Sequence, residues 1–581
     1  ASSSAASDVY KRQIIYSPFH SIGLFSVFDT DIIRNTDVFT GGFNAEYGGR
    51  VSSIMDIKTK DGNKKKFGGK LTANTFGSKL LLEGPLSKNQ KSSFVFSGKT
   101  SYLDKTSDIF YKEPLFTFDE NGLPYSYTDL YGKISLHGNN GSKFNLFGFN
   151  FQDLVDYENI SKLSWKSNGI GSEFILIPGN SPVLIEGNFA YSSYKISLDE
   201  AASPLRESGI SGFNMGFDFT YFKPKSKIKY GFDVHGYATD FLTYNSVNTP
   251  ITQNENTSEF SGYINYQYTS TRLIIEPGFR IQKYTLGLSP EPRLGLKYIV
   301  NEKTRLKLAS GFYSQNILST SSDRDVVNLF SGIISSPEEI PTQANGEEYA
   351  SKIQKAKHII TGIEFDVNNQ IDFQVEAYIK DFNQLTNINR NMTSDEDDTF
   401  IIETGIARGI DALVKYNSKK LYVWLVYSLG QVKRDDGIRE YSPHFDRRHN
   451  VNFVTSYKFG KKQDWKFDAR WNLGSGFPFT QTQGFYENIT FSDGINTDYT
   501  STNGDLGIQY AELNNGRLPY YHRLDISLAK NIAFKNNSNL NITASVTNAY
   551  NRENIFYFNR VKYDRVNQLP LMPSLGMSLT F

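Results

Sequence analysis

The sequence predicts an all-β fold: a transmembrane antiparallel β-barrel of about 22 strands, with part of an N-terminal plug domain inside its lumen. Three observations predict it. Apolar and polar residues alternate through residues 67–581, which is the periodicity of strands with one apolar face. The expected strands exceed the ~5–6 residues that are typical of globular sheets. Every long link between strands follows an odd-numbered strand.

The composition of the chain fits a membrane protein that crosses the bilayer with strands. Its 581 residues carry 62 basic and 61 acidic side chains, so net charge offers no case for a nucleic-acid partner. The longest apolar run, residues 421–429, is about half of the ~18 residues that a membrane-spanning helix needs. The mean hydropathy of −0.44 is expected of a barrel whose inner face is polar. Cysteine is absent, which excludes disulfides, zinc–thiolate sites and Cys nucleophiles.

The first residues, "ASSSAASDVYKRQ", lack the apolar core of a signal peptide. They match nothing in the rest of the chain, and we interpret residues 1–13 as a non-native leader. We expect the C-terminal part of a plug domain at residues 14–66. The transmembrane barrel is expected at residues 67–581.

Alternation assigns a lipid face and a lumen face to each strand. Residues 371–380 and 213–221 both place apolar side chains at every second position, between polar ones. We therefore expect Ile379 and Phe217 to face lipid and Glu376 to face the lumen. A soluble sandwich also alternates, so strand length and the connections decide between the two folds.

The alternating segments give the expected wall strands. They lie at residues 67–75, 77–85, 91–101, 128–138, 142–155, 163–178, 182–198, 207–223, 226–244, 256–269, 272–286, 291–301, 304–315, 350–368, 371–387, 398–417, 419–434, 446–459, 463–477, 520–534, 537–550 and 573–581.

The connections between these strands differ in length according to strand parity. Links after even-numbered strands are short, such as "GNNG", "KPKS" and "VNNQ", and contain the Asn, Gly or Pro of tight reversals. The long links, at about 102–127, 316–349, 478–519 and 551–572, all follow odd-numbered strands. Short turns at one rim and long loops at the other are typical of outer-membrane barrels. A lumen of this width needs a plug, and residues 14–63 enter from the short-turn side.

A glycine-rich stretch, "GGFNAEYGGRVSSIMDIKTKDGN", occupies residues 41–63, just before the first expected strand. It does not fit G-x-G-x-x-G, and no phosphate-binding G-K-[ST] follows. We interpret its paired glycines as turns and close approaches of the backbone in a compact domain. The segment "SSIMDIKTK" is expected to be a strand with Ile54 and Ile57 buried.

This stretch resembles the end of the plug domain in TonB-dependent outer-membrane receptors, particularly those of Bacteroidota. The resemblance continues in "DRDVVNLFSGIISSPE", "KAKHIITGIEFD", "KDFNQLTNINRN", "FDRRHNVNF", "GRLPYYHRLDISL", "VTNAYNRENIFYF" and "PSLGMSLTF". It implies active import across the Gram-negative outer membrane. In that family a scarce ligand binds at extracellular loops and plug, and the TonB complex pulls on an N-terminal TonB box. No such box stands in this sequence, so we expect an N-terminally truncated receptor.

The resemblance also implies roles for individual residues. Glu46 and Arg50 would fix the plug against charged groups of the barrel wall, or they form an ordinary buried ion pair without a mechanical role. Terminal Phe581 resembles the aromatic end that the barrel-assembly machinery recognises, and it also suits an aromatic girdle. The plug motif as a whole comprises Gly41, Gly42, Glu46, Tyr47, Gly48, Gly49 and Arg50.

Two long loops carry aromatic residues that are candidates for ligand contact. Aromatic side chains provide rigid contact area with a polar tip, although packing of each loop on itself explains them equally. The candidates are Tyr111, Phe116, Phe118, Tyr125, Tyr127, Phe485 and Tyr486.

Other chemistry is less well supported. The acidic run "DEDD" at residues 395–398 is a solvated run or a site for Ca²⁺ or a cationic ligand. Seven histidines, His20 among them, are scattered without metal-ligand spacing, and no Ser/His/Asp set stands out. We therefore expect no enzyme, no cofactor and no metal site. An outer-membrane lipase or protease is disfavoured.

Two functions from different classes stay open at this point. The first is an energy-coupled importer, and the second is a passive plugged channel or an adhesin-type barrel. The expected partners are membrane lipid and lipopolysaccharide, the TonB complex in the full-length protein, the barrel-assembly machinery and an unknown small ligand. We expect a monomeric barrel and no nucleic acid.

Overall fold

The structure is a computed structural model of the 581-residue chain. It describes residues 8–10, 13–20, 25–110, 123–157, 161–179, 181–200, 204–245, 249–320, 325–326, 329–340, 349, 351–390, 392, 396–488, 505–535, 538–558, 560, 563 and 565–581.

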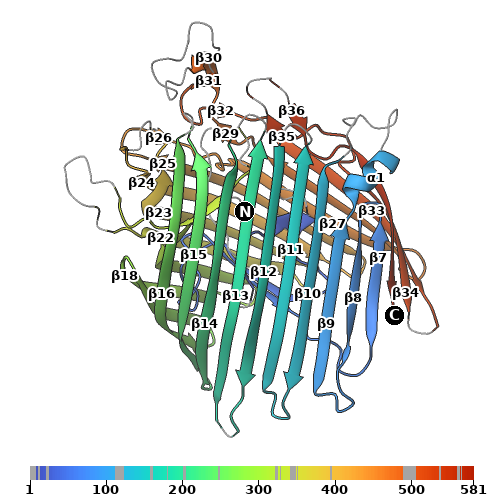
Figure 1. Ribbon diagram of the computed structural model, residues 1–581. Helices are drawn as coiled ribbons and strands as arrows, with labels where there is room; N and C mark the ends of the chain where they lie inside the picture. The colour runs from blue at the N-terminus through green and yellow to red at the C-terminus, as the bar shows by residue number, and fades with distance from the viewer. Residues whose placement is uncertain are drawn as a thin grey trace.

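A closed antiparallel barrel dominates the fold (Figure 1). Its first strands are β7 (Gly68–Asn74), β8 (Gly77–Pro85), β9 (Ser92–Ser101), β10 (Tyr125–His137), β11 (Lys143–Tyr157), β12 (Ser161–Leu176), β13 (Val183–Glu200), β14 (Arg206–Phe222), β15 (Ser226–Tyr244), β16 (Pro250–Thr269) and β17 (Leu273–Tyr284). The wall continues with β18 (Gly287–Ile299), β19 (Thr304–Gln315), β22 (Gln354–Asn368), β23 (Ile371–Ile388), β24 (Phe400–Asn417), β25 (Leu421–Asp435), β27 (His449–Phe459), β28 (Trp465–Gly474), β33 (Tyr521–Ala533), β34 (Asn539–Thr547) and β37 (Met572–Thr580).

These 22 wall strands correspond one to one to the strands expected from the sequence, which confirms the predicted fold class. The wall closes where β37 pairs with β7, and the backbones of Gly69 and Phe581 exchange two hydrogen bonds of 3.0 Å beside this seam. A short strand, β26 (Glu440–Tyr441), pairs with the end of β25. It adds no position to the wall, because β25 and β27 pair directly.

The long connections gather at one rim of the barrel, drawn at the top of Figure 1, and the short turns lie at the opposite rim. This arrangement confirms the predicted parity of the loops. None of the helices in the described part of the chain is long and apolar enough to span a membrane. The connections contain short helices and strands of their own. These elements are α1 (Leu103–Phe110), β20 (Ile317–Thr320), β21 (Gly332–Ser335), β29 (Pro478–Phe479), β30 (Thr482–Asn488), β31 (Asp505–Tyr510), β32 (Gly516–Arg517), β35 (Ile555–Phe558) and β36 (Arg565–Asn567).

The side chains of the wall face as the alternation predicts. Ile379 is 53% exposed on the outer surface, whereas Asn214 and Asp218 of β14 are buried on the inner side. Phe217 lies between them on the opposite face of its strand and contacts Phe232 of β15. Glu376 lines the lumen. Because lipid covers the outer face of such a barrel, these exposed apolar residues need no protein partner.

The N-terminal segment forms a small sheet inside the lumen, in the order β2-β1-β6-β5. Its strands are β1 (Asp8–Tyr10), β2 (Gln13–Ile15), β5 (Ile33–Phe39) and β6 (Ile54–Thr59). Between β2 and β5 in the sequence, β3 (Phe19–His20) pairs with β4 (Phe25–Ser26). We call residues 8–63 the plug.

The expected strand at residues 52–60 is therefore confirmed as β6. Ile54 and Ile57 are each 2% exposed, as expected. Strand β1 lies within residues 1–13 and pairs with β2 and β6, and the interpretation of that segment as a leader stays a prediction.

The largest buried apolar cluster joins the plug to the wall. Ile15, Val27 and Ile57 of the plug belong to the same cluster as Phe149 and Trp165 of the wall. Burial of apolar area across this contact contributes about 25 cal/mol per Å². The core of the protein therefore lies between the plug and the inner wall.

Candidate functional site

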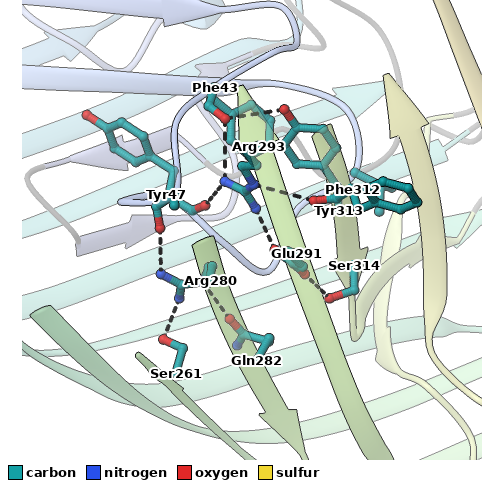
Figure 2. A network of polar contacts seen from close by, with 12 residues as sticks. Phe43, Tyr47, Ser261, Arg280, Gln282, Glu291, Arg293, Phe312, Tyr313 and Ser314 are labelled. Carbon is teal, nitrogen blue, oxygen red and sulfur yellow. Dashed lines mark hydrogen bonds and ion pairs between the residues drawn. The ribbon is translucent and has the colours of Figure 1, made fainter. Parts of the chain in front are cut away.

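The candidate site is the contact between the plug loop, defined here as residues 41–52, and the inner face of the wall. Arg293 of β18 reaches into this loop, as Figure 2 shows. Its guanidinium donates to the carbonyl oxygen of Asn44 at 2.6 Å and to that of Tyr47. Its other terminal nitrogen pairs with Glu291 at 2.5 Å. The planar fork of arginine has enough donors to bind backbone carbonyls and a carboxylate together.

Aromatic rings hold the Arg293 guanidinium in place. Its central carbon lies 4.3 Å from the ring centre of Tyr313 and 5.0 Å from that of Phe43. The Tyr313 hydroxyl donates to the carbonyl oxygen of Phe43 at 3.3 Å. Phe43 and Tyr313 are each 1% exposed, so this cation–π arrangement is shielded from water. Cation–π contacts are stronger when they are desolvated.

A second arginine, Arg280 of β17, binds the next residues of the loop. It donates to the carbonyl oxygens of Ala45 and Glu46, both at 3.3 Å. Asp233 accepts at 3.2 Å and Gln282 at 2.8 Å, so the buried charge is well paired. Because Arg280 binds backbone carbonyl oxygens, this contact depends on the backbone conformation of the loop rather than on its side chains.

The glycines of the loop are explained by this geometry. A Cβ on Gly48 would lie 2.0 Å from Nε of Arg280, so only glycine leaves room for the guanidinium. Gly42 and Gly49 have φ of 64° and 70°, a region that glycine adopts without strain. This agrees with the interpretation of the paired glycines as turns and close approaches.

Glu46 and Arg50 both face the wall. Glu46 forms an ion pair with Lys229 of β15, and Arg50 is 4% exposed and interacts electrostatically with Glu259 of β16. These partners are charged groups of the barrel wall. A mechanical role for Glu46 and Arg50 stays a prediction.

The end of the loop is bound by polar side chains of three further wall strands. Gln315 of β19 accepts from the amide of Val51 at 3.0 Å, and Nε2 of His358 on β22 lies 2.9 Å from the carbonyl oxygen of Val51. Lys380 of β23 donates to the carbonyl oxygen of Ser52 at 3.1 Å. Strands β15–β19, β22 and β23 thus form one side of the plug's seat.

Another part of the seat, on β10, β11 and β12, surrounds His20 of β3, which is fully buried. Its ring lies between Tyr127 and Trp165, with ring centroids 4.4 Å and 5.0 Å away and interplanar angles of 8° and 6°. Its Nε2 is 2.8 Å from Asp129, and its Nδ1 is 3.5 Å from Asp153. Burial alone lowers the pKa of His20, but the hydrogen bonds and charges of the two carboxylates outweigh burial and raise it.

Ion pairs join the plug to the wall near the start of the barrel as well. Asp61 lies 2.8 Å from Lys133 and 2.9 Å from Lys143. Burial by itself raises the pKa of Asp61, and the two ammonium groups nevertheless hold that pKa well below its usual range. Asp31 pairs with Lys70 at 2.9 Å and with Lys79. These pairs join the plug to β7, β8, β10 and β11 of the wall.

The predicted ligand-contact aromatics divide into three groups. Tyr111, Phe116 and Phe118 lie outside the described residues. Phe485 and Tyr486 lie on β30 above the rim and are 37% and 45% exposed. Contact of these residues with a ligand stays a prediction.

Tyr125 and Tyr127 form the third group, and their expected place in a loop is wrong. Both belong to wall strand β10, which starts earlier than expected because its register with β11 continues to Tyr125 opposite Val155. Tyr125 is fully buried, and its hydroxyl lies 2.8 Å from that of Tyr157. Tyr127 stacks on His20 of the plug, so it binds the plug in this structure.

The remaining predicted positions are on the surface. Phe581 is 48% exposed at the closing seam of the barrel, which suits both interpretations of this residue. Within the acidic run, residue 395 lies outside the described residues, and residues 396–398 form a turn before β24.

Sequence reasoning missed Arg280 and Arg293 as wall groups that bind the plug, and His20 as a plug residue that binds the wall. A signal for the two arginines exists, because each is a charged residue at a lumen-facing position of an alternating strand. Nothing in the spacing shows which lumen-facing charges meet the plug. That depends on how the strands are ordered around the barrel.

Comparisons with known proteins support the fold. The chain is similar to the ferric citrate transporter FecA in its unliganded form (12% identity, TM-score 0.65, 97% of this chain and 86% of that one). It is also similar to the FrpB iron transporter of Neisseria meningitidis (11%, 0.65, 98% and 90%). A third is FpvA of P. aeruginosa bound to a heterologous pyoverdine (11%, 0.67, 97% and 77%).

No family model matches the chain, and no curated protein matches it in sequence. The structural likeness shows the fold that these proteins share with the closed barrel of 22 strands.

Proposed function

We propose that this protein is an outer-membrane active transporter, a TonB-dependent receptor that binds a scarce ligand at extracellular loops and plug and imports it to the periplasm. One observation supports the proposal: a segment with a small sheet of its own is seated inside a closed barrel by polar contacts with the wall. Arg280, Arg293 and His20 all act across this contact. Hydrogen bonds and ion pairs of this kind are replaceable by water when the plug moves, so a pulled plug can be released and seated again.

The similar structures favour an iron chelate as the first ligand to test, since two of them are described as an iron transporter and a ferric citrate transporter. The proposal includes energy from the TonB complex, folding by the barrel-assembly machinery and a monomeric barrel surrounded by lipid and lipopolysaccharide.

Uptake measurements test this proposal. A strain from which the gene is deleted should lose growth under iron limitation or on a defined glycan, and the gene should restore growth only when TonB is present. Uptake that persists without TonB and rises in proportion to solute concentration would instead establish a passive channel.

A further inference from the structure

A large cavity runs beside the plug, between the plug loop and one side of the wall. It has a volume of about 920 Å³ and is bordered by Thr40, Val51, Ser52 and Ser53 of the plug. Its other border is formed by inner-face residues of β23, β24, β25, β27, β28 and β33. Ligand sites in proteins commonly have volumes of about 300–1,000 Å³, so this cavity has room for a small solute.

The cavity lining is more basic than the balanced composition of the chain suggests. The described residues that line it include two acidic residues, Glu376 and Asp411, and six basic residues, a formal net charge of +4. The whole chain has a formal net charge of +1. The six basic residues are Lys380, Lys433, Arg434, Arg447, Arg470 and Arg523.

Four of these six already have protein partners. Lys380 donates to the plug, and Lys433, Arg434 and Arg523 pair with carboxylates at 3.2, 3.3 and 2.9 Å. Arg447 and Arg470 differ, because within the described part of the chain neither forms an ion pair. A half-buried guanidinium, that of Arg447, and an exposed one, that of Arg470, thus face the cavity without a carboxylate partner in the described part of the chain.

Arg447 is held in place at the long-loop end of the cavity. Its central guanidinium carbon lies 4.0 Å from the ring centre of Phe477 and 5.7 Å from that of Tyr521. A Cβ on Gly474 would lie 2.5 Å from the guanidinium, so the absence of a side chain there makes room for it. Its buried Nε has no hydrogen-bond partner. The group is positioned by packing rather than by an acid.

Arg470 lies deeper along the same wall, four residues before Gly474 on β28, or about 13 Å at ~3.3 Å per residue. Its Nε donates to the amide oxygen of Asn472 at 3.0 Å, and Asn472 in turn donates to Asn452. Arg523 is the register partner of Asn472 on β33. The strands therefore place arginine and amide donors in a row from the mouth inward.

We propose that Arg447 and Arg470, with the neighbouring Asn452 and Asn472, form a binding surface for a small polyanionic, oxygen-rich solute such as a polycarboxylate. Guanidinium groups bind carboxylate oxygens with paired, charge-assisted hydrogen bonds, and amide groups add neutral donors. A row of such sites holds several oxyanion groups of one solute at once. The inference names the substrate class of the proposed transporter and to that extent rests on the proposed function.

Calorimetric titration of the purified full chain in detergent at low salt tests the inference. The probes are citrate and its neutral trimethyl ester. Citrate should bind and trimethyl citrate should not, and added NaCl should weaken citrate binding because exposed charges are screened. Arg470→Gln and Arg447→Gln should each raise the citrate Kd about tenfold or more.

Arg408→Gln is the matched control, because Arg408 is exposed on β24, donates to Gln431 and does not line the cavity. It removes the same charge and should leave the Kd within about twofold. Heat-modifiable migration on gels confirms that each variant is folded, and Arg447→Lys, which keeps the charge, replaces Arg447→Gln if that variant does not fold.

Absence of citrate binding to the unmodified chain overturns the inference, and so does equal binding of both probes or an equal effect of the Arg408 change. Because the titration contains no TonB, its failure together with TonB-dependent uptake rejects only this inference. Citrate binding without TonB-dependent uptake rejects only the proposed function.

Discussion

Arg293 of the barrel wall donates a hydrogen bond of 2.6 Å to the backbone carbonyl of Asn44 in the plug. These residues are 249 positions apart, and the contact specifies a backbone path rather than a side chain. Such a contact tolerates sequence change in the plug but depends on the arginine. It is therefore a suitable place to test how the plug is seated.

Removing the wall arginines should loosen the plug. The double change Arg280→Gln and Arg293→Gln removes hydrogen bonds from charged donors, which contribute about 1.5–3 kcal/mol each. We expect more frequent channel openings in planar bilayers and faster proteolysis within residues 41–52. Arg305→Gln serves as the control, since Arg305 pairs with Glu364 and Asp366 of the wall. Equal opening of the control and the double variant would show that the effect is not specific to the plug.

The seat around His20 should weaken as pH rises. The folded pKa of His20 is raised above its ordinary value of 6.5, so its stabilising contribution is complete below about pH 6.5. It is lost as pH increases through the folded pKa, because the neutral ring no longer balances Asp129 and Asp153. Lys99, 2.9 Å from Asp129, remains to offset part of that charge.

Thermal unfolding between pH 5.5 and 8.5 would measure this effect. The melting temperature of the unmodified protein should fall across this range by more than that of His20→Gln. His449→Gln, which alters an outer-face histidine next to Tyr427, should keep the full pH dependence. A parallel pH profile for His20→Gln would rule out His20 as the titrating group.

Gly48→Ala should displace Arg280 from the plug. The added Cβ would lie 2.0 Å from Nε of that arginine, and overpacking of this kind costs about 1–3 kcal/mol. Gly132→Ala in β10 is the control, because a Cβ there meets no atom within 4 Å. Urea unfolding should show the loss for Gly48→Ala alone, and equal stability of the two variants would contradict the close approach.

A charged side chain introduced on the lipid face should lower the stability of the barrel, whereas one introduced in the lumen should change that stability little. Phe217→Arg and Ile379→Arg should lower the stability of the barrel in lipid by about 2–4 kcal/mol if they reach mid-bilayer. Glu376→Arg, which faces the lumen cavity, should change stability much less. Folding yield into lipid vesicles and urea titration measure both, and similar losses at both kinds of position would reverse the assignment of faces.

The architecture was predictable because it follows from local pattern. Each strand repeats an apolar and a polar face every second residue, and each reversal has its own turn residues, so residues 371–379 identify a wall strand without knowledge of its neighbours. The boundary of β10 was harder to predict, since the strand continues through Tyr125 only because β11 is long enough to pair with it. The positions of strand ends depend on the partner.

The sequence by itself determined the number of wall strands, which side chains face lipid and the rim that carries the long loops, because these depend on alternation and turn chemistry within a few residues. Only the tertiary structure decided that Arg280 and Arg293 bind the plug loop, that His20 lies between Tyr127 and Trp165, and that Arg447 and Arg470 face a cavity. Closure of the barrel brings residues together across hundreds of positions. The local sequence pattern does not indicate which lumen-facing charge will contact which part of the plug.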